Sequence, residues 1–449
     1  MLLLLLLLTT FVLAEDSRIT VPYTRFTLPN GLSVILHEDH SVPTVSVNVW
    51  YHVGSGNEKP GRTGFAHLFE HIMFEGSGNV PEGKFDEWLE ASGGDNNGST
   101  TGDRTNYYEN VPSNALELPL FLESDRMGFL LNAMTPGKVD GQRDVVKNER
   151  RQSYENRPYG LAFPTLAENL YPKDHPYHWP TIGSMEDLSA ASYDDVVQFF
   201  KTYYVPNNAS LVVAGDINTE QTKTLVTKWF SDVPMGKPAP PLFYPPAVLT
   251  EEKRVVLEDP MVKQLPRLYM AWHSPRSFAP GDAELDILSS VLAGGKTSRL
   301  YKRLVYDLQI AQDVSAFQYS SAITSSFMIV STARSGHTLT EIENVIQEEL
   351  DKIKAEPPTA MEVQRAVNQY EASFLDRLEG AAGKADQLNA YFKATGNPDY
   401  FNEDLARYQA IDAKDVQSVC NRYLKNDARV ILSIVPVGMK ELAAMKGGK

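Results

Sequence analysis

The sequence predicts an α+β protein of two duplicated, structurally similar domains, each a mixed or antiparallel β-sheet packed with helices. Three observations lead to this prediction. A chain of 449 residues is too long for one ordinary core and fits two domains of roughly 200 residues. A proline-rich stretch lies near the middle of the chain. The order of strand and helix patterns before that stretch recurs after it, at an offset of about 220 residues.

Residues 1–14 are a leucine-rich run that ends in small residues. The run is too short to span a membrane and is typical of the apolar region of a secretory signal peptide. We therefore expect a mature chain from about Glu15, without a membrane span, that is secreted, with the bacterial periplasm as its destination. No Lys or Arg precedes the leucines, so an uncleaved N-terminal anchor is the alternative.

The first domain is expected over residues 15–232. Residues 26–36 have the pattern of two strands joined by a Pro-Asn-Gly turn, and apolar and polar residues alternate over 44–53 as in a half-buried strand. Pro136-Gly137 is expected to separate two helices. The other expected elements are helices over 85–92, 115–132, 142–156 and 192–204, a break over 93–98, and strands over 99–110 and 209–215.

Residues 233–252 are expected to be a linker, because six prolines lie within or beside this stretch without a periodic apolar pattern. The second domain is then expected over 253–449. The helix expected at 283–292 corresponds in order to the helix that carries the metal motif in the first half, yet it has no histidine pair. We therefore expect the chemistry in the first half only.

The metal motif is His67-Leu68-Phe69-Glu70-His71. On a helix, the i, i+4 spacing puts both imidazoles on one face, where they can share a metal ion. Glu70 lies beside them and can reach a water on that metal without ligating it. This order is the inverted form of the common zinc-protease motif. A helix with two histidines that only pack or face solvent is the simpler alternative.

Zinc sites of this class need three protein ligands and one open position. The helix expected over 142–156 offers Asp144, Glu149 and Glu155, and spacing alone does not choose among them. Zinc lowers the pKa of a bound water toward about 7, and a nearby carboxylate can then take its proton as the water attacks a peptide carbonyl. Glu70 is the expected general base.

Composition excludes several other classes. A hydrophobic content of 42% with 22% charged residues is typical of a globular protein. A net charge of −15 argues against binding to nucleic acid, which requires clustered Lys and Arg. Cys420 is the only cysteine, so no intramolecular disulfide can form.

The chain resembles the pitrilysin/insulinase family of zinc peptidases, the inverzincins. The resemblance rests on the Gly-x-x-Gly-x-Ala-His-x-x-Glu-His run over 61–71, the Gly93-Gly94 break with Asn97, the Thr-Asn-Tyr-Tyr run over 105–108, and the duplicated halves. It spans essentially the whole mature chain. In size the chain is similar to the two-domain, half-size members, which include the mitochondrial processing peptidase β subunit and bacterial periplasmic homologues.

This resemblance implies roles for single residues. Glu149, in Val145-Val146-Lys147-Asn148-Glu149, matches the third ligand, which gives one Zn²⁺ per chain. Gln142 stands where the family usually has a supporting Glu, and an amide can hydrogen-bond but cannot act as a base. Asn97 is similar to a family residue that holds the substrate backbone. A simple turn over 95–98 also explains its composition.

The resemblance also implies a partner. Complete family enzymes contact the substrate and the developing oxyanion with an Arg and a Tyr, and the matching positions here are Val305 and Gln312. Arg303 and Tyr306 lie close by at the wrong spacing. A homologous subunit is expected to supply Arg and Tyr in a heterodimer that encloses a chamber, with a homodimer as the alternative.

The sequence therefore predicts a zinc-dependent endopeptidase that cleaves unfolded peptides in a closed chamber. The alternative is a non-catalytic, zinc-stabilised assembly or chaperone-like subunit of the same family, which the missing Arg and Tyr favour.

Overall fold

Two β-sheets organise the chain in the computed structural model, which describes residues 18–446. The expected signal peptide lies outside the described residues. The first sheet has six strands in the order β1-β2-β6-β3-β5-β4, and the second has five in the order β7-β11-β8-β10-β9. The strands are β1 (Thr24–Thr27), β2 (Ser33–Glu38), β3 (Thr44–Tyr51), β4 (Asp95–Thr100), β5 (Thr105–Pro112), β6 (Ala209–Gly215), β7 (Lys253–Asp259), β8 (Arg267–Ser274), β9 (Ala311–Tyr319), β10 (Ser325–Ala333) and β11 (Val430–Pro436).

Apart from β1, the two sheets have the same topology. The pairs β2–β6 and β7–β11 are parallel, and the remaining neighbours in each sheet are antiparallel. Both β6 and β11 are buried along their whole length, because each lies inside its sheet and is covered on both faces. The predicted fold class, two duplicated α+β units, is confirmed.

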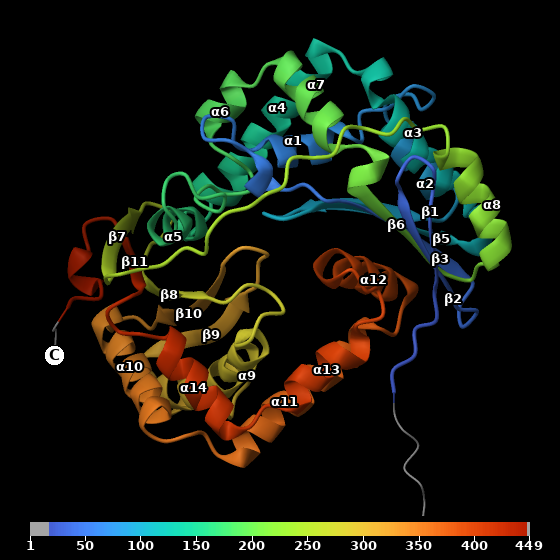
Figure 1. Cartoon of the computed structure of the whole chain (residues 1–449). Coiled ribbons are helices and arrows are strands. Elements are labelled where there is room, and N and C mark those ends of the chain that lie inside the picture. The colour runs from blue at the N-terminus through green and yellow to red at the C-terminus, as the bar shows by residue number, and fades with distance from the viewer. Residues whose placement is uncertain (1–17, 447–449) are drawn as a thin grey trace, which may run out of the picture.

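Helices cover these sheets (Figure 1). They are α1 (Phe65–Ile72), α2 (Lys84–Ala91), α3 (Glu117–Ala133), α4 (Pro136–Arg150), α5 (Ala162–Leu170), α6 (Met185–Ala190), α7 (Tyr193–Tyr203), α8 (Thr219–Phe230), α9 (Asp282–Ala293), α10 (Leu339–Ala355), α11 (Ala360–Arg377), α12 (Ala381–Thr395), α13 (Phe401–Gln409) and α14 (Ala413–Tyr423). In the first half, α1, α7 and α3 bury apolar side chains against the first sheet in one continuous core.

In addition, one helix from each half packs on the sheet of the other half. Helix α12 packs on β3 and β6, where Asn389 donates to the carbonyl of Asn48 at 3.0 Å and accepts from the hydroxyl of Ser210 at 2.7 Å. Helix α5 packs in the same way on β8 and β11 of the second sheet. This exchange is visible in Figure 1. It ties the two halves together through two helix–sheet contacts, and Ala247 of the linker stretch packs in the same apolar cluster as α5.

Two local predictions are wrong. Pro136-Gly137 does not separate two helices: α4 begins at Pro136, with Thr135 capping it through a hydrogen bond from the N–H of Lys138. Proline suits the first turn of a helix, since the N–H that it lacks has no helical partner there. Residues 95–98 form no turn, and they belong to β4, which pairs with β5 as a hairpin. Strand pairing here overrides the turn preference of Asp, Asn and Gly.

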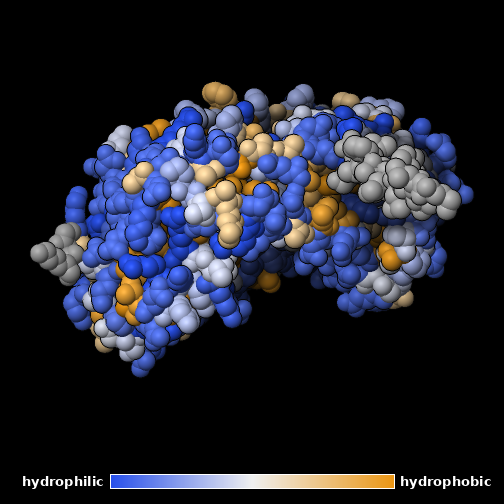
Figure 2. All heavy atoms as spheres, turned by 90° about the horizontal axis from the view of Figure 1, so that it is seen from below, coloured by the Kyte–Doolittle hydropathy of each residue, from blue (hydrophilic) through white to orange (hydrophobic). Residues whose placement is uncertain are grey.

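No helix or strand lies between Phe230, where α8 ends, and Lys253, where β7 begins. The expected linker therefore has no regular structure, while the domain boundaries at 232 and 253 stay predictions. Among the described residues, no helix is both long enough and apolar enough to cross a membrane. The face shown in Figure 2 is mostly hydrophilic with scattered apolar patches, and its outline is concave on one side.

Candidate metal centre

Helix α1 carries the metal motif and begins at a glycine turn. Gly64 has a φ of 88°, and a Cβ there would lie 2.6 Å from the carbonyl oxygen of Ile182, so only glycine fits. Leu68, Phe69 and Ile72 are buried against the first core. The opposite face therefore presents His67 and His71, whose ring centroids lie 4.8 Å apart.

A buried carboxyl group holds the start of this helix. Glu58 accepts hydrogen bonds from the N–H of Gly64 at 2.9 Å and of Ala66 at 2.8 Å. The first N–H groups of a helix have no partner within the helix, so Glu58 satisfies donors that would otherwise be buried alone. Burial raises the pKa of Glu58 to about 8. Sequence reasoning missed this residue, because it lies outside the motif and its reach depends on the turn over 59–63.

The third member of the cluster is Glu149, near the end of α4, which packs against α1. Its Oε2 atom lies 3.2 Å from Nε2 of His71 and 3.7 Å from Nε2 of His67. Within residues 18–446, these three side chains form the one group of at least three His, Cys, Asp or Glu whose ligand atoms all lie within 4.8 Å of one another. Asp144 and Glu155 are not part of it, and Glu155 instead pairs with Arg150 at 3.0 Å.

These distances fit a zinc ion. With metal–ligand bonds of about 2.1 Å in a tetrahedron, neighbouring ligand atoms lie about 3.4 Å apart. The two measured N···O distances, 3.2 and 3.7 Å, bracket that value. Two imidazoles and one carboxylate are also the donor set of a catalytic zinc site, which leaves a fourth position open.

The protonation states suit ligation as well. Burial lowers the pKa of His67 to about 4, so its imidazole is neutral at neutral pH. The hydrogen bond with His71 lowers the pKa of Glu149, which keeps that carboxylate ionised. Neutral imidazole and ionised carboxylate are the forms that bind a metal. The Nδ1 atom of His67 is buried without a hydrogen-bond partner among the described residues, so packing and the contact of Nε2 with Glu149 orient this ring.

Glu70 lies beside the cluster without belonging to it. Its Oε2 atom accepts a hydrogen bond of 2.6 Å from the hydroxyl of Thr100, at the end of β4. Burial raises the pKa of Glu70. Gly98 lets β4 pass close by, since a Cβ there would lie 3.1 Å from Cγ of Glu70. Sequence reasoning missed Thr100, because the hairpin that brings it to Glu70 was not expected.

The remaining predicted residues lie nearby without entering the cluster. Asn97 belongs to β4, the edge strand of the first sheet, and its Oδ1 accepts from the N–H of Gly98 at 2.8 Å. Gln142 lies two helical turns before Glu149 on α4 and donates to Glu75, just after α1. The edge strand was expected to begin after Asn97, but in the structure it includes Asn97.

The segment of the second half that was expected to match the Arg and Tyr positions does not offer those groups. Val305 packs against the core of the second half, and Gln312 is exposed near the start of β9. Arg303 pairs with Glu348 on α10 at 2.8 Å, and Tyr306 is 73% exposed.

Comparison with known proteins gives the family. A profile described as "Insulinase (Peptidase family M16)" matches residues 33–178, and one described as "Peptidase M16 inactive domain" matches residues 190–370. "Zinc protease PqqE" of Helicobacter pylori is 28% identical over 415 residues, which cover 91% of this chain and 92% of that protein. The "Probable mitochondrial-processing peptidase subunit beta" of Arabidopsis thaliana is 27% identical over 444 residues, 95% of this chain and 81% of that one.

Comparison with solved structures indicates the same family. The crystal structure of a protease from Helicobacter pylori matches with a TM-score of 0.86 at 26% identity, and the match covers 93% of this chain and all of that one. Several relatives carry the name zinc protease. The first matched profile lies within the first half, the second runs from residue 190 across the linker stretch into the second half, and both belong to one family. The chain is therefore a member of the M16 peptidase family, the insulinase or pitrilysin family.

Proposed function

We propose that this protein is a zinc-dependent endopeptidase that hydrolyses unfolded peptides, with His67, His71 and Glu149 as the ligands of one zinc ion. The observation that carries the proposal is the spacing of the three ligand atoms beside a carboxylate that is not a ligand. A zinc ion bound by these residues would supply an acidified water and polarise the scissile carbonyl.

Glu70 is the proposed proton carrier. One of its oxygens, Oε2, is held by Thr100, which leaves Oε1 free to take a proton from the attacking water. The same atom then delivers that proton to the nitrogen of the leaving amine. The raised pKa of Glu70 suits both steps, since a carboxyl group with a pKa nearer neutrality accepts and releases a proton more readily.

The substrate is proposed to bind as an added strand on β4. This strand has an unpaired outer side in the described sheet and runs past Glu70. Main-chain hydrogen bonds to an edge strand tolerate many sequences but require an extended, unfolded segment. Asn97, on this strand, is the proposed contact to the substrate backbone.

A partner subunit is the second part of the proposal. The chain has Val305 and Gln312 where an Arg and a Tyr would serve the oxyanion, and Arg303 is already paired with Glu348. The plant relative is named as a β subunit. We propose a heterodimer whose homologous partner supplies both groups in a closed chamber. A homodimer is an alternative assembly, although a second copy would also have Val305 and Gln312. A non-catalytic, zinc-stabilised assembly or chaperone-like subunit is the alternative that these two positions favour.

Location is part of this proposal too. The leucine-rich run over 1–14 supports secretion, and fractionation of cells producing the full chain would test it. A full-length chain retained in the membrane would replace secretion with the anchored alternative.

Cleavage of a quenched, unstructured peptide tests the activity. The zinc-loaded chain is assayed alone and with candidate homologous subunits. The mixture with the correct subunit should cleave the peptide, and a chelator should stop cleavage. Glu70→Gln should lower kcat by about 10³-fold while one zinc stays bound. Glu90→Gln, on the exposed surface of α2, is the matched control. Activity that survives in the Glu70 variant would overturn the mechanism. Turnover by the chain alone would remove the need for a different partner.

A further inference from the structure

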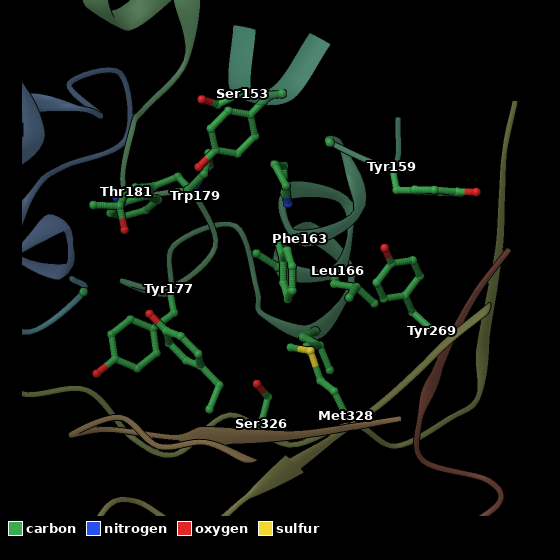
Figure 3. A pocket seen from close by; sticks show the side chains of 18 of the residues that line it. Ser153, Tyr159, Phe163, Leu166, Tyr177, Trp179, Thr181, Tyr269, Ser326 and Met328 are labelled. Carbon is green, nitrogen blue, oxygen red and sulfur yellow. The ribbon is translucent and has the colours of Figure 1, made fainter. Parts of the chain in front are cut away.

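A cavity of about 570 Å³ lies beside the metal centre, between the two halves of the chain. Residues of the first half that follow α4 form one side, including Tyr154, Phe163 and Trp179. Tyr269 and Met328, from β8 and β10 of the second sheet, form the other (Figure 3). None of these residues takes part in the chemistry proposed above.

Three of the aromatic residues that line the cavity are held in place by hydrogen bonds from their polar tips. The hydroxyl of Tyr159 donates to the carbonyl of Leu265 at 2.6 Å, and that of Tyr177 donates to Asp103 at 2.5 Å. The indole N–H of Trp179 donates to the carbonyl of Ser55 at 3.0 Å. Such anchoring fixes the rings while leaving apolar ring surface for contact. The walls are therefore preorganised and need little reordering when a ligand enters.

Part of the apolar surface of the cavity wall is exposed to solvent. Phe163 lines the cavity and is 52% exposed, and its ring centroid lies 6.3 Å from that of Tyr269. Burying this surface against another ring would stabilise a complex through area and ring geometry together. The volume of about 570 Å³ also lies within the range of roughly 300–1,000 Å³ that is typical of ligand pockets.

The cavity is continuous with the metal centre. Glu149 belongs to both, and Ser153 and Tyr154 carry the wall onward from the next turn of the chain. Gly102, in the hairpin turn just after β4, also lines the cavity. An extended peptide that pairs with β4 therefore has the cavity at the end of its path, close to the cluster.

The charges of the lining residues restrict which substrate side chain can bind in the cavity. Glu149 is the one acidic residue in the lining, and a bound metal would neutralise it, whereas Arg157 and Arg267 are both cationic. Arg267 lies over the ring of Tyr159, 3.8 Å from its centroid. A lysine or arginine side chain would be repelled here. An aromatic side chain matches the rings and can also receive a guanidinium on its face.

We propose that this cavity is the specificity pocket of the enzyme and binds one aromatic side chain of the substrate near the scissile bond. The inference rests on the proposed peptidase function, but it makes a separate claim about binding.

Calorimetric titration of the zinc-loaded Glu70→Gln chain tests it without turnover. The probes are Gly/Ser-rich ten-residue peptides that carry a single Phe, Leu, Ala or Lys, moved along the sequence. At one position the Phe peptide should bind about 10-fold more tightly than the Ala peptide, and the Lys peptide no better than Ala. Phe163→Ala should remove most of this difference, and Ser153→Trp, which fills the cavity, should do the same. Phe129→Ala, on α3 away from the cavity, should preserve it.

Zinc content and a single thermal transition verify that each variant is folded. Equal binding of Phe and Ala peptides at every position overturns the inference, as does a preference that survives in both cavity variants. Cleavage by the unmodified chain is scored separately. Cleavage without an aromatic preference in binding would contradict the proposed pocket but support the peptidase function. An aromatic preference in binding without any cleavage would support the pocket but contradict the peptidase function.

Discussion

The hydroxyl of Thr100 donates a hydrogen bond of 2.6 Å to Oε2 of Glu70, which joins the edge strand of the first sheet to the helix that carries the metal motif. Thr100 therefore fixes the carboxyl group that is proposed to move the proton. The same strand is proposed to bind the substrate, so one element positions both the peptide and the base.

Replacing Thr100 with Val should remove this hydrogen bond at nearly constant volume. We expect kcat to fall about 10-fold, because a freely rotating Glu70 reaches the attacking water less often, while KM and zinc content change little. Steady-state kinetics with the quenched peptide measure the effect. Thr100→Ser keeps the hydroxyl and should restore most of kcat. Equal losses in the Val and Ser variants would contradict the assigned role of the hydrogen bond, because Ser keeps the hydroxyl group.

Glu149 should be essential for zinc binding, unlike the other acidic candidates on the same helix. Glu149→Gln should weaken zinc binding at least 100-fold, since a neutral amide is a poor zinc ligand. Glu155→Gln is the matched control, because Glu155 pairs with Arg150 and lies outside the cluster. Competition with a chromophoric chelator measures both affinities. Loss of zinc from the Glu155 variant alone would reassign the third ligand.

The metal motif illustrates how far sequence reasoning reaches. Helical spacing places His67, Glu70 and His71 on one face whatever the rest of the chain does, and the structure has them there. Glu149 is different, because three acidic residues on or next to one helix satisfy the same spacing argument. Family resemblance chose Glu149, and the packing of α4 on α1 brings that residue, but neither of the others, into the cluster.

The contact of Thr100 with Glu70 and the aromatic cavity could not be predicted from the sequence, for a physical reason. Thr100 reaches Glu70 only because residues 95–98, whose composition favours a turn, pair with β5 as a strand. The cavity collects side chains from segments more than 150 residues apart along the chain. Local periodicity carries no information about such contacts, which depend on how α5 is exchanged between the two halves.

Removing the carboxyl group of Glu58 should destabilise the start of α1. Glu58→Ala leaves the N–H groups of Gly64 and Ala66 buried without acceptors, which should lower the free energy of unfolding by about 2–4 kcal/mol. Glu58→Gln keeps one carbonyl oxygen and should cost about half as much. Urea denaturation measures both, with the exposed Glu87→Ala as the control. Stability equal to the parent chain in the Ala variant would contradict the assigned role.

Two histidines at the junction of the halves, His175, which is buried, and His273, which is partly buried, should make the fold sensitive to acid. His175 follows α5, and His273 belongs to β8 of the second sheet. Burial lowers the pKa of each to about 4, below the 6.5 of an exposed histidine. His178 and Asp174 lie near His175, Lys253 lies near His273, and the two histidines also repel each other when charged.

A histidine whose pKa is lower in the folded chain stabilises the fold above the unfolded pKa, and its contribution is lost as the pH falls toward the folded pKa. The free energy of unfolding should therefore decrease by about 2–4 kcal/mol between pH 6.5 and pH 4 because of this pair. Urea titrations across that range measure the slope. The double variant His175→Asn/His273→Asn should reduce the slope of the free energy of unfolding against pH. This reduction is expected whether or not the double variant is less stable than the parent chain at neutral pH. His40→Asn should not, since hydrogen bonding to Asp216 raises the pKa of that exposed histidine. An acid slope unchanged by the double variant would assign the sensitivity to other groups.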